Sequence, residues 1–112
     1  MLLKKNRLNK KKDFENIFKK GKSFKEDFLI LKFVPNYSNL IRFGFIVSQK
    51  ISKKASLRNK IKRRIAESIR LKIGKLKKRL DGILLALPGI GKKDFWEIDE
   101  TIKELFKKAK VL

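Results

Sequence analysis

The chain has 112 residues, and its 32 lysines and arginines against 11 acids give a formal net charge of +21. It contains neither cysteine nor histidine, which excludes disulfide scaffolds, thiolate or imidazole metal sites, cysteine nucleophiles and Ser-His-Asp triads. Hydrophobic residues make up 42% of the chain, and the length predicts one domain over residues 1–112.

The net charge predicts a polyanionic partner, because self-repulsion of this size destabilises a compact state unless anions offset it. Nucleic acid is favoured over an anionic membrane surface, since no strongly apolar helix face is free to enter a bilayer. No apolar run approaches the ~18 residues that span a membrane, and the apolar start at Leu2 is too short for a signal peptide. We therefore expect a cytoplasmic chain with no membrane partner.

A short helix is predicted near the N-terminus, over Leu8–Lys20. Phe14 and Phe18 lie there at helical spacing, one turn apart. Asn9 is a candidate N-cap, and Gly21 follows the last turn. The pattern therefore indicates an amphipathic helix whose aromatic side chains share one face.

Two β-rich runs follow this helix. The first covers Phe24–Val34 and is ended by Pro35 and turn-forming residues that include Asn39, and the second covers Leu40–Val47. The polar loop between the two runs predicts that they pair as antiparallel neighbours. A small additional strand is expected near Ser23.

The second half of the chain predicts a helix, a strand and a helix. Isoleucines at helical spacing indicate a helix over Leu57–Ile73, which we expect Gly74 to end in a left-handed cap. The continuous apolar run Ile83–Leu87 is typical of a buried strand. The amphipathic pattern over Phe95–Lys110 places acids early and lysines late, as the helix dipole favours.

Cations are concentrated on the predicted central helix. Steps of 100° place Asn59, Lys62, Arg63, Ala66 and Arg70 on the side away from the isoleucines. Like charges at i, i+4 destabilise an isolated helix by ~0.2–0.5 kcal/mol per pair. A phosphate backbone is the partner that would offset this repulsion, and a solvated basic face is the alternative.

The same helix carries a longer motif. From residue 53 to residue 65 it reads Lys-Lys-Ala-Ser-Leu-Arg-Asn-Lys-Ile-Lys-Arg-Arg-Ile. This closely resembles the signature of the protein subunit of bacterial ribonuclease P, whose hallmark is Arg-Asn-Arg followed by Ile-Lys-Arg. The segments Arg7–Ser23 and Arg42–Lys50 also resemble that family in the same order, so the resemblance covers nearly the full chain.

The resemblance implies an α+β fold, an α/β sandwich like domain 2 of ribosomal protein S5. Its mixed four-stranded sheet and three helices would follow the order α-β-β-β-α-β-α. The family's βαβ crossover is left-handed, which contradicts the ~98% right-handed rule and which the sequence pattern alone does not predict.

The resemblance also implies a function. In this family the catalyst is a large RNA that uses magnesium ions, and the protein helps it to bind precursor tRNA while the 5′ leader is removed. The chain would be a non-catalytic subunit of this endoribonuclease, with one protein per RNA and no cofactor of its own.

Two RNA-binding surfaces are implied by carry-over from the family. The motif helix would bind the catalytic RNA. Its residues are Arg58, Asn59, Lys60, Lys62 and Arg63. A cleft between the first helix and the sheet would hold the single-stranded 5′ leader of precursor tRNA. Its residues are Phe14, Phe18, Lys50 and, on the floor, Leu31 and Ile46.

The chain departs from the family pattern at several positions. Lys60 replaces the third residue of the triplet, which keeps the charge but loses the planar fork of arginine. Ala66 stands where the family usually has another arginine, so we expect one phosphate contact to be missing. Leu31 and Ile46 occupy positions that are often polar or aromatic, which makes base stacking on the sheet less favourable.

Carboxylates offer no evident catalytic site. Acids are scarce and none is paired within the basic motif, so acid–base and nucleophilic chemistry lack candidates. Glu97, Asp99 and Glu100 are close enough in sequence to suggest a metal cluster, but an acidic first helical turn explains them better.

Three other functions remain open. A structural protein of the ribosome would share the size and charge, and copurification with a single large non-ribosomal RNA would distinguish the two. A membrane-active cationic helix would need the apolar face that the core requires, and would bind liposomes more strongly than RNA. A sequence-specific DNA-binding protein would need a dimer or a recognition helix, which nothing in the pattern suggests.

Overall fold

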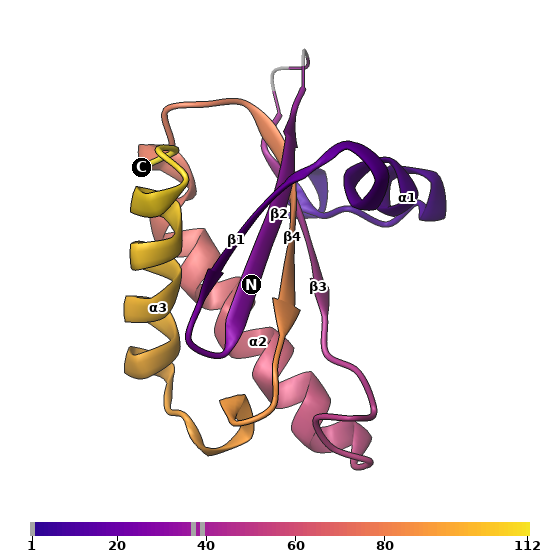
Figure 1. Ribbon diagram of the computed structural model, residues 1–112, viewed down its shortest axis with the longest axis vertical. Helices are drawn as coiled ribbons and strands as arrows, with labels where there is room; N and C mark the ends of the chain where they lie inside the picture. The colour runs from indigo at the N-terminus through magenta and orange to yellow at the C-terminus, as the bar shows by residue number, and fades with distance from the viewer. Residues whose placement is uncertain (1, 37, 39) are drawn as a thin grey trace.

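The strands form one mixed sheet in the computed structural model, which describes residues 2–36, 38 and 40–112. Its strands are β1 (Lys22–Glu26), β2 (Leu29–Pro35), β3 (Arg42–Ile46) and β4 (Leu80–Ala86), in the spatial order β1-β2-β4-β3. Within the described ranges the α-helices are α1 (Lys11–Lys20), α2 (Ala55–Lys72) and α3 (Phe95–Lys108). Helices α2 and α3 cover one face of the sheet, and α1 lies against one end of the other face (Figure 1). The expected α+β architecture is therefore confirmed.

The strand order corrects one prediction. Strands β2 and β3 do not pair with each other, because β4 lies between them, antiparallel to β2 and parallel to β3. Strand β4 contains the continuous apolar run, and the central position buries such a strand on both faces. The loop between β2 and β3 was expected to make a hairpin turn, and its residues Tyr37 and Asn39 lie outside the described residues.

Strands β3 and β4 and helix α2 form a parallel βαβ unit. In Figure 1, β3 lies to the right of β4, both strands run downward, and α2 crosses behind the sheet. This arrangement is left-handed, as the resemblance implied, and opposite to the hand of ~98% of such units.

The N-terminal segment joins the sheet instead of extending the first helix. Helix α1 begins at Lys11, and its N-cap is Lys10 without a side-chain cap, so the predicted start and the cap by Asn9 are wrong. The N–H of Leu8 donates to the carbonyl of Phe43 at 2.9 Å, and Leu8 is buried. Pairing with the edge of β3 thus satisfies backbone that would otherwise have formed a helical turn.

Two further local predictions have different outcomes. The small strand expected near Ser23 is confirmed as β1, which pairs with β2 in an antiparallel hairpin. The left-handed cap at Gly74 is wrong, because Gly74 lies in a 3-10 turn (Ile73–Lys75) that continues α2. Within the described part of the chain, the glycine with a positive φ is Gly89, at 103°, in the turn after β4.

The sheet separates a larger core from a smaller one. The larger core lies against α2 and α3 and contains Ile61, Ile65 and Ile69, which are 0% exposed, so the predicted isoleucine stripe is confirmed. The smaller core lies under α1 and centres on Ile17 and Ile83. Among the described residues, no helix is long and apolar enough to cross a membrane.

Candidate nucleic-acid interface

The cations of α2 lie in two rows along the first half of the helix. Asn59, Lys60 and Arg63 are exposed, and Arg58 and Lys62 are half-buried on one flank. The first turn holds no acid, and no side chain caps the N-terminus of the helix. Free N–H groups and the positive end of the helix dipole therefore add to the charge of the four cations among these five residues, which together we call the motif surface.

Two arginines of α2 also bind backbone carbonyls within the protein. Arg58 donates from Nη1 to the carbonyl of Ser52 at 2.8 Å, in the loop before α2. Arg64 donates from Nη1 to the carbonyl of Lys93 at 2.8 Å, in the segment before α3. Arg64 therefore links two elements, whereas Arg63 stays exposed and keeps its guanidinium available for a partner.

Ala66 corrects the placement predicted from helical spacing. It is 8% exposed and lines a small cavity with Leu2 and Arg7, so it does not lie on the open face of α2. Lys62 borders the same cavity. Helical spacing did not reveal this because the N-terminal segment packs along that flank of the helix. Ala66 is therefore part of the contact between α2 and the N-terminal segment, and it does not belong to the exposed cationic face of α2.

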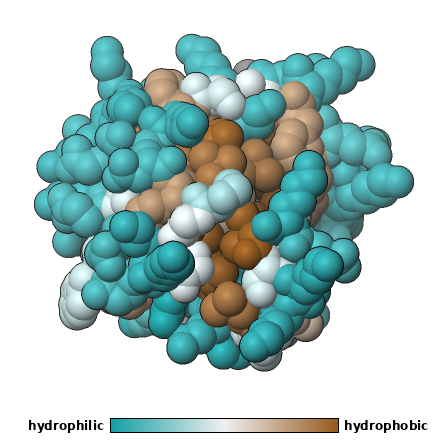
Figure 2. Space-filling view, turned by 60° about the horizontal axis from the view of Figure 1, so that its bottom comes forward, coloured by the Kyte–Doolittle hydropathy of each residue, from teal (hydrophilic) through white to brown (hydrophobic). Residues whose placement is uncertain are grey.

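An apolar row crosses the face of the sheet that α1 leaves open. Ile30, Leu85 and Ile46 are register partners on β2, β4 and β3, and all three are half-buried. Lys25 continues the row on β1. The end of the sheet that carries this row comes forward in Figure 2, where hydrophobic side chains gather in the middle of the surface among hydrophilic ones. We call Ile30, Leu85 and Ile46 the open row.

The two phenylalanines of α1 differ in their surroundings. Phe14 packs onto Gly44, where an added Cβ would lie 2.4 Å from the ring, so only glycine allows this close approach. Phe18 is 42% exposed, and Nζ of Lys32 lies 5.4 Å from its ring centroid, in cation–π range. Phe18 is therefore accessible to a ligand, and Phe14 is chiefly an anchor of the smaller core.

Leu31 does not lie on the face of the sheet beside α1, which corrects its assignment to the floor of the leader site. It is 1% exposed and packs in the larger core on the opposite face. Side chains alternate along a strand, so its neighbours Ile30 and Lys32 lie on the face of the sheet that carries α1. The structure thus brings Phe14, Phe18 and Ile46 to one face, and it places Lys50 in an exposed turn after β3.

Arg42 fixes α1 to the sheet. Its Nε and Nη2 donate to the two carboxylate oxygens of Asp81 at 2.9 and 2.6 Å, and its Nη1 lies 3.5 Å from a carboxylate oxygen of Asp13 on α1. The hydrogen bond to Asp81, reinforced by the charges of Asp81 and Asp13, raises the pKa of Arg42 although partial burial opposes it. The charged, bidentate contact therefore joins β3 to β4, and the longer ion pair with Asp13 links α1 to the same guanidinium.

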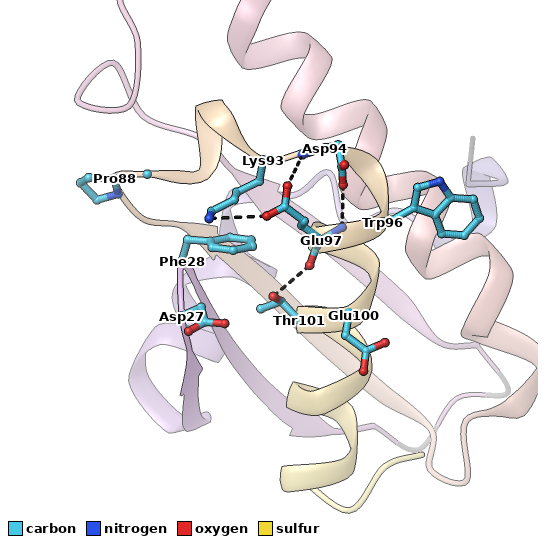
Figure 3. A pocket seen from close by; sticks show the side chains of 10 residues that line it. Asp27, Phe28, Pro88, Lys93, Asp94, Trp96, Glu97, Glu100 and Thr101 are labelled. Atoms are coloured by element: carbon cyan, nitrogen blue, oxygen red, sulfur yellow. Dashed lines mark hydrogen bonds and ion pairs between the residues drawn. The ribbon is translucent and has the colours of Figure 1, made fainter.

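Asp94 and Glu97, at the start of α3, have structural partners (Figure 3). Asp94 accepts from the N–H of Glu97 at 2.8 Å, and Glu97 accepts from the N–H of Asp94 at 3.3 Å, which makes a capping box. Glu97 also lies 3.5 Å from Nζ of Lys93. Asp99 turns to α2, where it accepts from Ser68 at 2.7 Å and pairs with Lys72. Glu97 and Asp99 thus face different elements, as expected for a helix start.

The comparisons with known proteins decide the family. The family model described as Ribonuclease P matches residues 2–110. The chain belongs to the ribonuclease P protein family. The ribonuclease P protein component of Clostridium acetobutylicum is 38% identical over 109 residues, which cover 96% of this chain and 91% of that protein. The resemblance seen in the motif is therefore confirmed, and the chain is a protein component of ribonuclease P, which acts in tRNA processing.

Solved structures agree with this assignment. The RNase P protein of Staphylococcus aureus superposes with a TM-score of 0.87 at 31% identity, covering 95% of this chain and 96% of that one. A Staphylococcus aureus RNase P protein mutant with defective mRNA degradation activity gives a TM-score of 0.88 at 30% identity, covering 96% and 90% of the two chains. The fold is thus that of the ribonuclease P proteins over nearly the whole length.

Proposed function

We propose that the motif surface binds the catalytic RNA of ribonuclease P, and that the open row beside α1 binds the single-stranded 5′ leader of precursor tRNA. The RNA would perform the hydrolysis and hold the magnesium ions, and one protein chain would serve one RNA. The observation that carries the proposal is the gathering of Asn59, Lys60 and Arg63 on the exposed, uncapped first half of α2.

The motif surface has the chemistry that a folded RNA backbone requires. Its cations lie on a rigid helix whose buried side is anchored by Ile61 and Ile65, so binding phosphate needs little reordering of the protein. Double-helical RNA is recognised chiefly through shape and backbone contacts, which suits a convex cationic helix. Both features support the first half of the proposal.

The open row has the features of a single-strand platform. Such platforms combine an aromatic side chain that stacks on bases with cations that follow the backbone. Phe18 supplies the exposed ring, Lys32 and Lys25 supply cations, and the apolar row supplies the floor. The described surface thus supports leader binding with a different set of sheet residues from the one that the resemblance named.

Four of the described acids are held by cations, which supports a non-catalytic role for them. Asp13 and Asp81 contact Arg42, Glu67 pairs with Arg70, and Asp99 pairs with Lys72. The hydrogen bond from Arg70 lowers the pKa of Glu67 to about 2. Burial raises the pKa of Asp99, but hydrogen bonds from Lys72 and Ser68 lower it by more, so these two carboxyls are poorly suited to donate a proton in acid catalysis.

Messenger RNA degradation is the alternative to test, because a mutant of the Staphylococcus aureus RNase P protein is described as defective in that activity. We expect the purified chain, freed of RNA, to leave a labelled messenger transcript intact. Cleavage that persists after nuclease treatment and repurification of the chain would contradict the non-catalytic role.

The test of the proposed function is reconstitution of precursor tRNA cleavage at low magnesium with the cognate RNA. Arg58→Ala with Arg63→Ala should weaken assembly with that RNA by about 2–4 kcal/mol, since charge-assisted contacts contribute ~1.5–3 kcal/mol each and are not additive. Lys77→Ala with Lys78→Ala, an equal loss of charge at exposed positions beyond the other end of α2, should leave assembly nearly unchanged. Equal weakening by both pairs would show that net charge alone drives binding.

A further inference from the structure

A small cavity lies between the N-terminal segment and the flank of α2. Its volume is about 150 Å³. The lining residues come from the N-terminal segment, β3 and α2, and are Leu2, Arg7, Phe45, Lys62, Arg63 and Ala66. This cavity is on the opposite side of the sheet from the open row, because Phe45 and Ala66 pack with the larger core.

The interior and the rim of the cavity differ in chemistry. The interior is apolar, with Leu2 3% exposed, Ala66 8% exposed and Phe45 half-buried. The more exposed lining residues are cations: Arg7 and Arg63 are exposed, and Lys62 is half-buried. None of the six lining residues is acidic. The site therefore suits a ligand with an apolar flat part and negative charge beside it.

The size of the cavity limits the apolar part to one ring system. An apolar protein cavity of about 150 Å³ binds a benzene molecule. A lipid chain is too long for this space, and a neutral apolar guest would gain nothing from three cations at the rim. A nucleobase meets both conditions, because it is a planar ring joined to a backbone with a phosphate on either side.

We propose that this cavity binds one unstacked nucleobase of RNA, whose flanking phosphates contact Arg7, Lys62 and Arg63. The inference rests on the proposed function and deepens it, since Lys62 and Arg63 belong to the motif surface. Proteins read RNA mainly at splayed bases that stack on aromatic side chains, and Phe45 is the aromatic ring available here. The motif surface thus binds backbone and one base together.

The wall of the cavity is held in place by hydrogen bonds. Arg7 donates from Nε and Nη2 to the carbonyl of Leu2 at 3.0 and 2.8 Å, and Asn6 donates from Nδ2 to the carbonyl of Ile41 at 2.8 Å. Ala66 provides the room, because a longer side chain at this position would extend into the cavity. The departure from the family pattern at Ala66 therefore coincides with space for a base.

The test fills the cavity and measures binding of the cognate ribonuclease P RNA to the full chain. Ala66→Leu places three further carbons in the apolar space, a kind of change that commonly stabilises a protein. Its Tm should therefore be equal to or above that of the unaltered chain. The control is Gly74→Leu, where an added Cβ meets nothing within 4 Å and the side chain extends into solvent.

We expect Ala66→Leu to raise the Kd for this RNA about 5- to 100-fold, the loss of one stacked base, and Gly74→Leu to leave it unchanged. The slope of log affinity against log salt should stay the same, because no phosphate contact is lost. Chemical footprinting should show that a single base becomes accessible in the complex with Ala66→Leu. By contrast, Lys62→Ala should reduce the slope by about 0.9.

Three outcomes would overturn the inference. The first is equal affinity and footprint for Ala66→Leu and the unaltered chain. The second is weaker binding with a reduced salt slope, which would mean that leucine displaces the rim cations. The third is equal loss of affinity with Gly74→Leu. Failure of the unaltered chain to bind the RNA would instead overturn the proposed function, and this inference with it.

Discussion

Phe14 and Phe18 lie one turn apart on α1, yet only one of them is available to a ligand. Phe14 fills the space above Gly44, and Phe18 stays 42% exposed beside Lys32. Helical spacing predicts that the two rings share a face, but it does not tell which ring the sheet covers. That difference depends on a glycine in β3, which is thirty residues further along the chain than Phe14.

Phe18→Ala should weaken binding of leader-bearing precursor tRNA about 5- to 100-fold, because the stacking of one base contributes ~1–3 kcal/mol. Binding of mature tRNA should change little, since it lacks the leader. Phe14→Ala should instead lower the free energy of unfolding by about 2–4 kcal/mol, somewhat less than the ~3–5 kcal/mol of a fully buried phenylalanine, because Phe14 is half-buried. Filter binding and urea unfolding measure the two effects. Equal losses for precursor and mature tRNA with Phe18→Ala would contradict the leader cleft.

Lys60 is the third residue of the motif triplet, where the family pattern has an arginine. Lys60→Arg restores the planar fork that can donate two parallel hydrogen bonds to a phosphate. We expect this variant to bind the catalytic RNA about 3- to 10-fold more tightly, a gain near 1 kcal/mol. Lys77→Arg is the matched control at an exposed position away from the motif surface. No gain relative to this control would show that Lys60 does not face a phosphate.

At the scale of elements, the sequence predicts each helix and strand but not how they meet. The buried faces of the helices, the buried strand and the cationic face of α2 can be predicted from the hydrophobic pattern. That pattern shows which side of a single element is buried. The position of β4 between β2 and β3 is a contact between distant segments. The burial of Ala66 likewise depends on a distant segment, the N-terminus. Leu31 lies in an almost continuous apolar run, where weak alternation does not show which face of the sheet its side chain takes.

The contact between Arg42 and Asp81 joins β3 to β4, and Arg42 also pairs with Asp13 of α1. Asp81 is 8% exposed and also accepts from Nδ2 of Asn36 at 2.9 Å. Asp81→Asn should lower the free energy of unfolding by about 1–3 kcal/mol, less than for a fully buried pair because Arg42 is partly exposed. Asp13→Asn, which removes only the longer contact to Arg42, should cost under about 1 kcal/mol. Equal costs in urea unfolding would mean that Asp81 is not the main partner of Arg42.

The contact between α2 and α3 predicts a dependence on pH. Burial raises the pKa of Asp99, but hydrogen bonds from Lys72 and Ser68 outweigh this and hold it below its ordinary value. A lowered pKa in the folded state stabilises the protein above about pH 4, and the contribution is lost as the pH falls through the folded pKa. Tm should therefore drop more steeply below pH 4 for the unaltered chain than for Asp99→Asn. Parallel curves would contradict this role.

At the scale of the whole molecule, the two proposed surfaces lie on different sides of one sheet. The motif surface belongs to α2, which covers one face, and the open row lies on the other face beside α1 (Figure 1). A chain of this size can therefore contact a large RNA and a single strand at once. The lysines and arginines behind the net charge of +21 are spread along the chain, so the charge favours RNA binding at both surfaces.

This distribution of charge predicts that the affinity for the leader depends strongly on salt concentration. If about six cations contact a single-stranded leader, log affinity should fall with log salt with a slope near −4, a loss of a few hundredfold between 50 and 200 mM salt. Lys32→Ala, beside Phe18, should reduce that slope by about 0.7, the contribution of one phosphate contact to a single strand. Phe18→Ala should weaken binding without changing the slope, since a stacked base releases no counterion. A slope near zero for the unaltered chain would contradict an electrostatic contact with the leader.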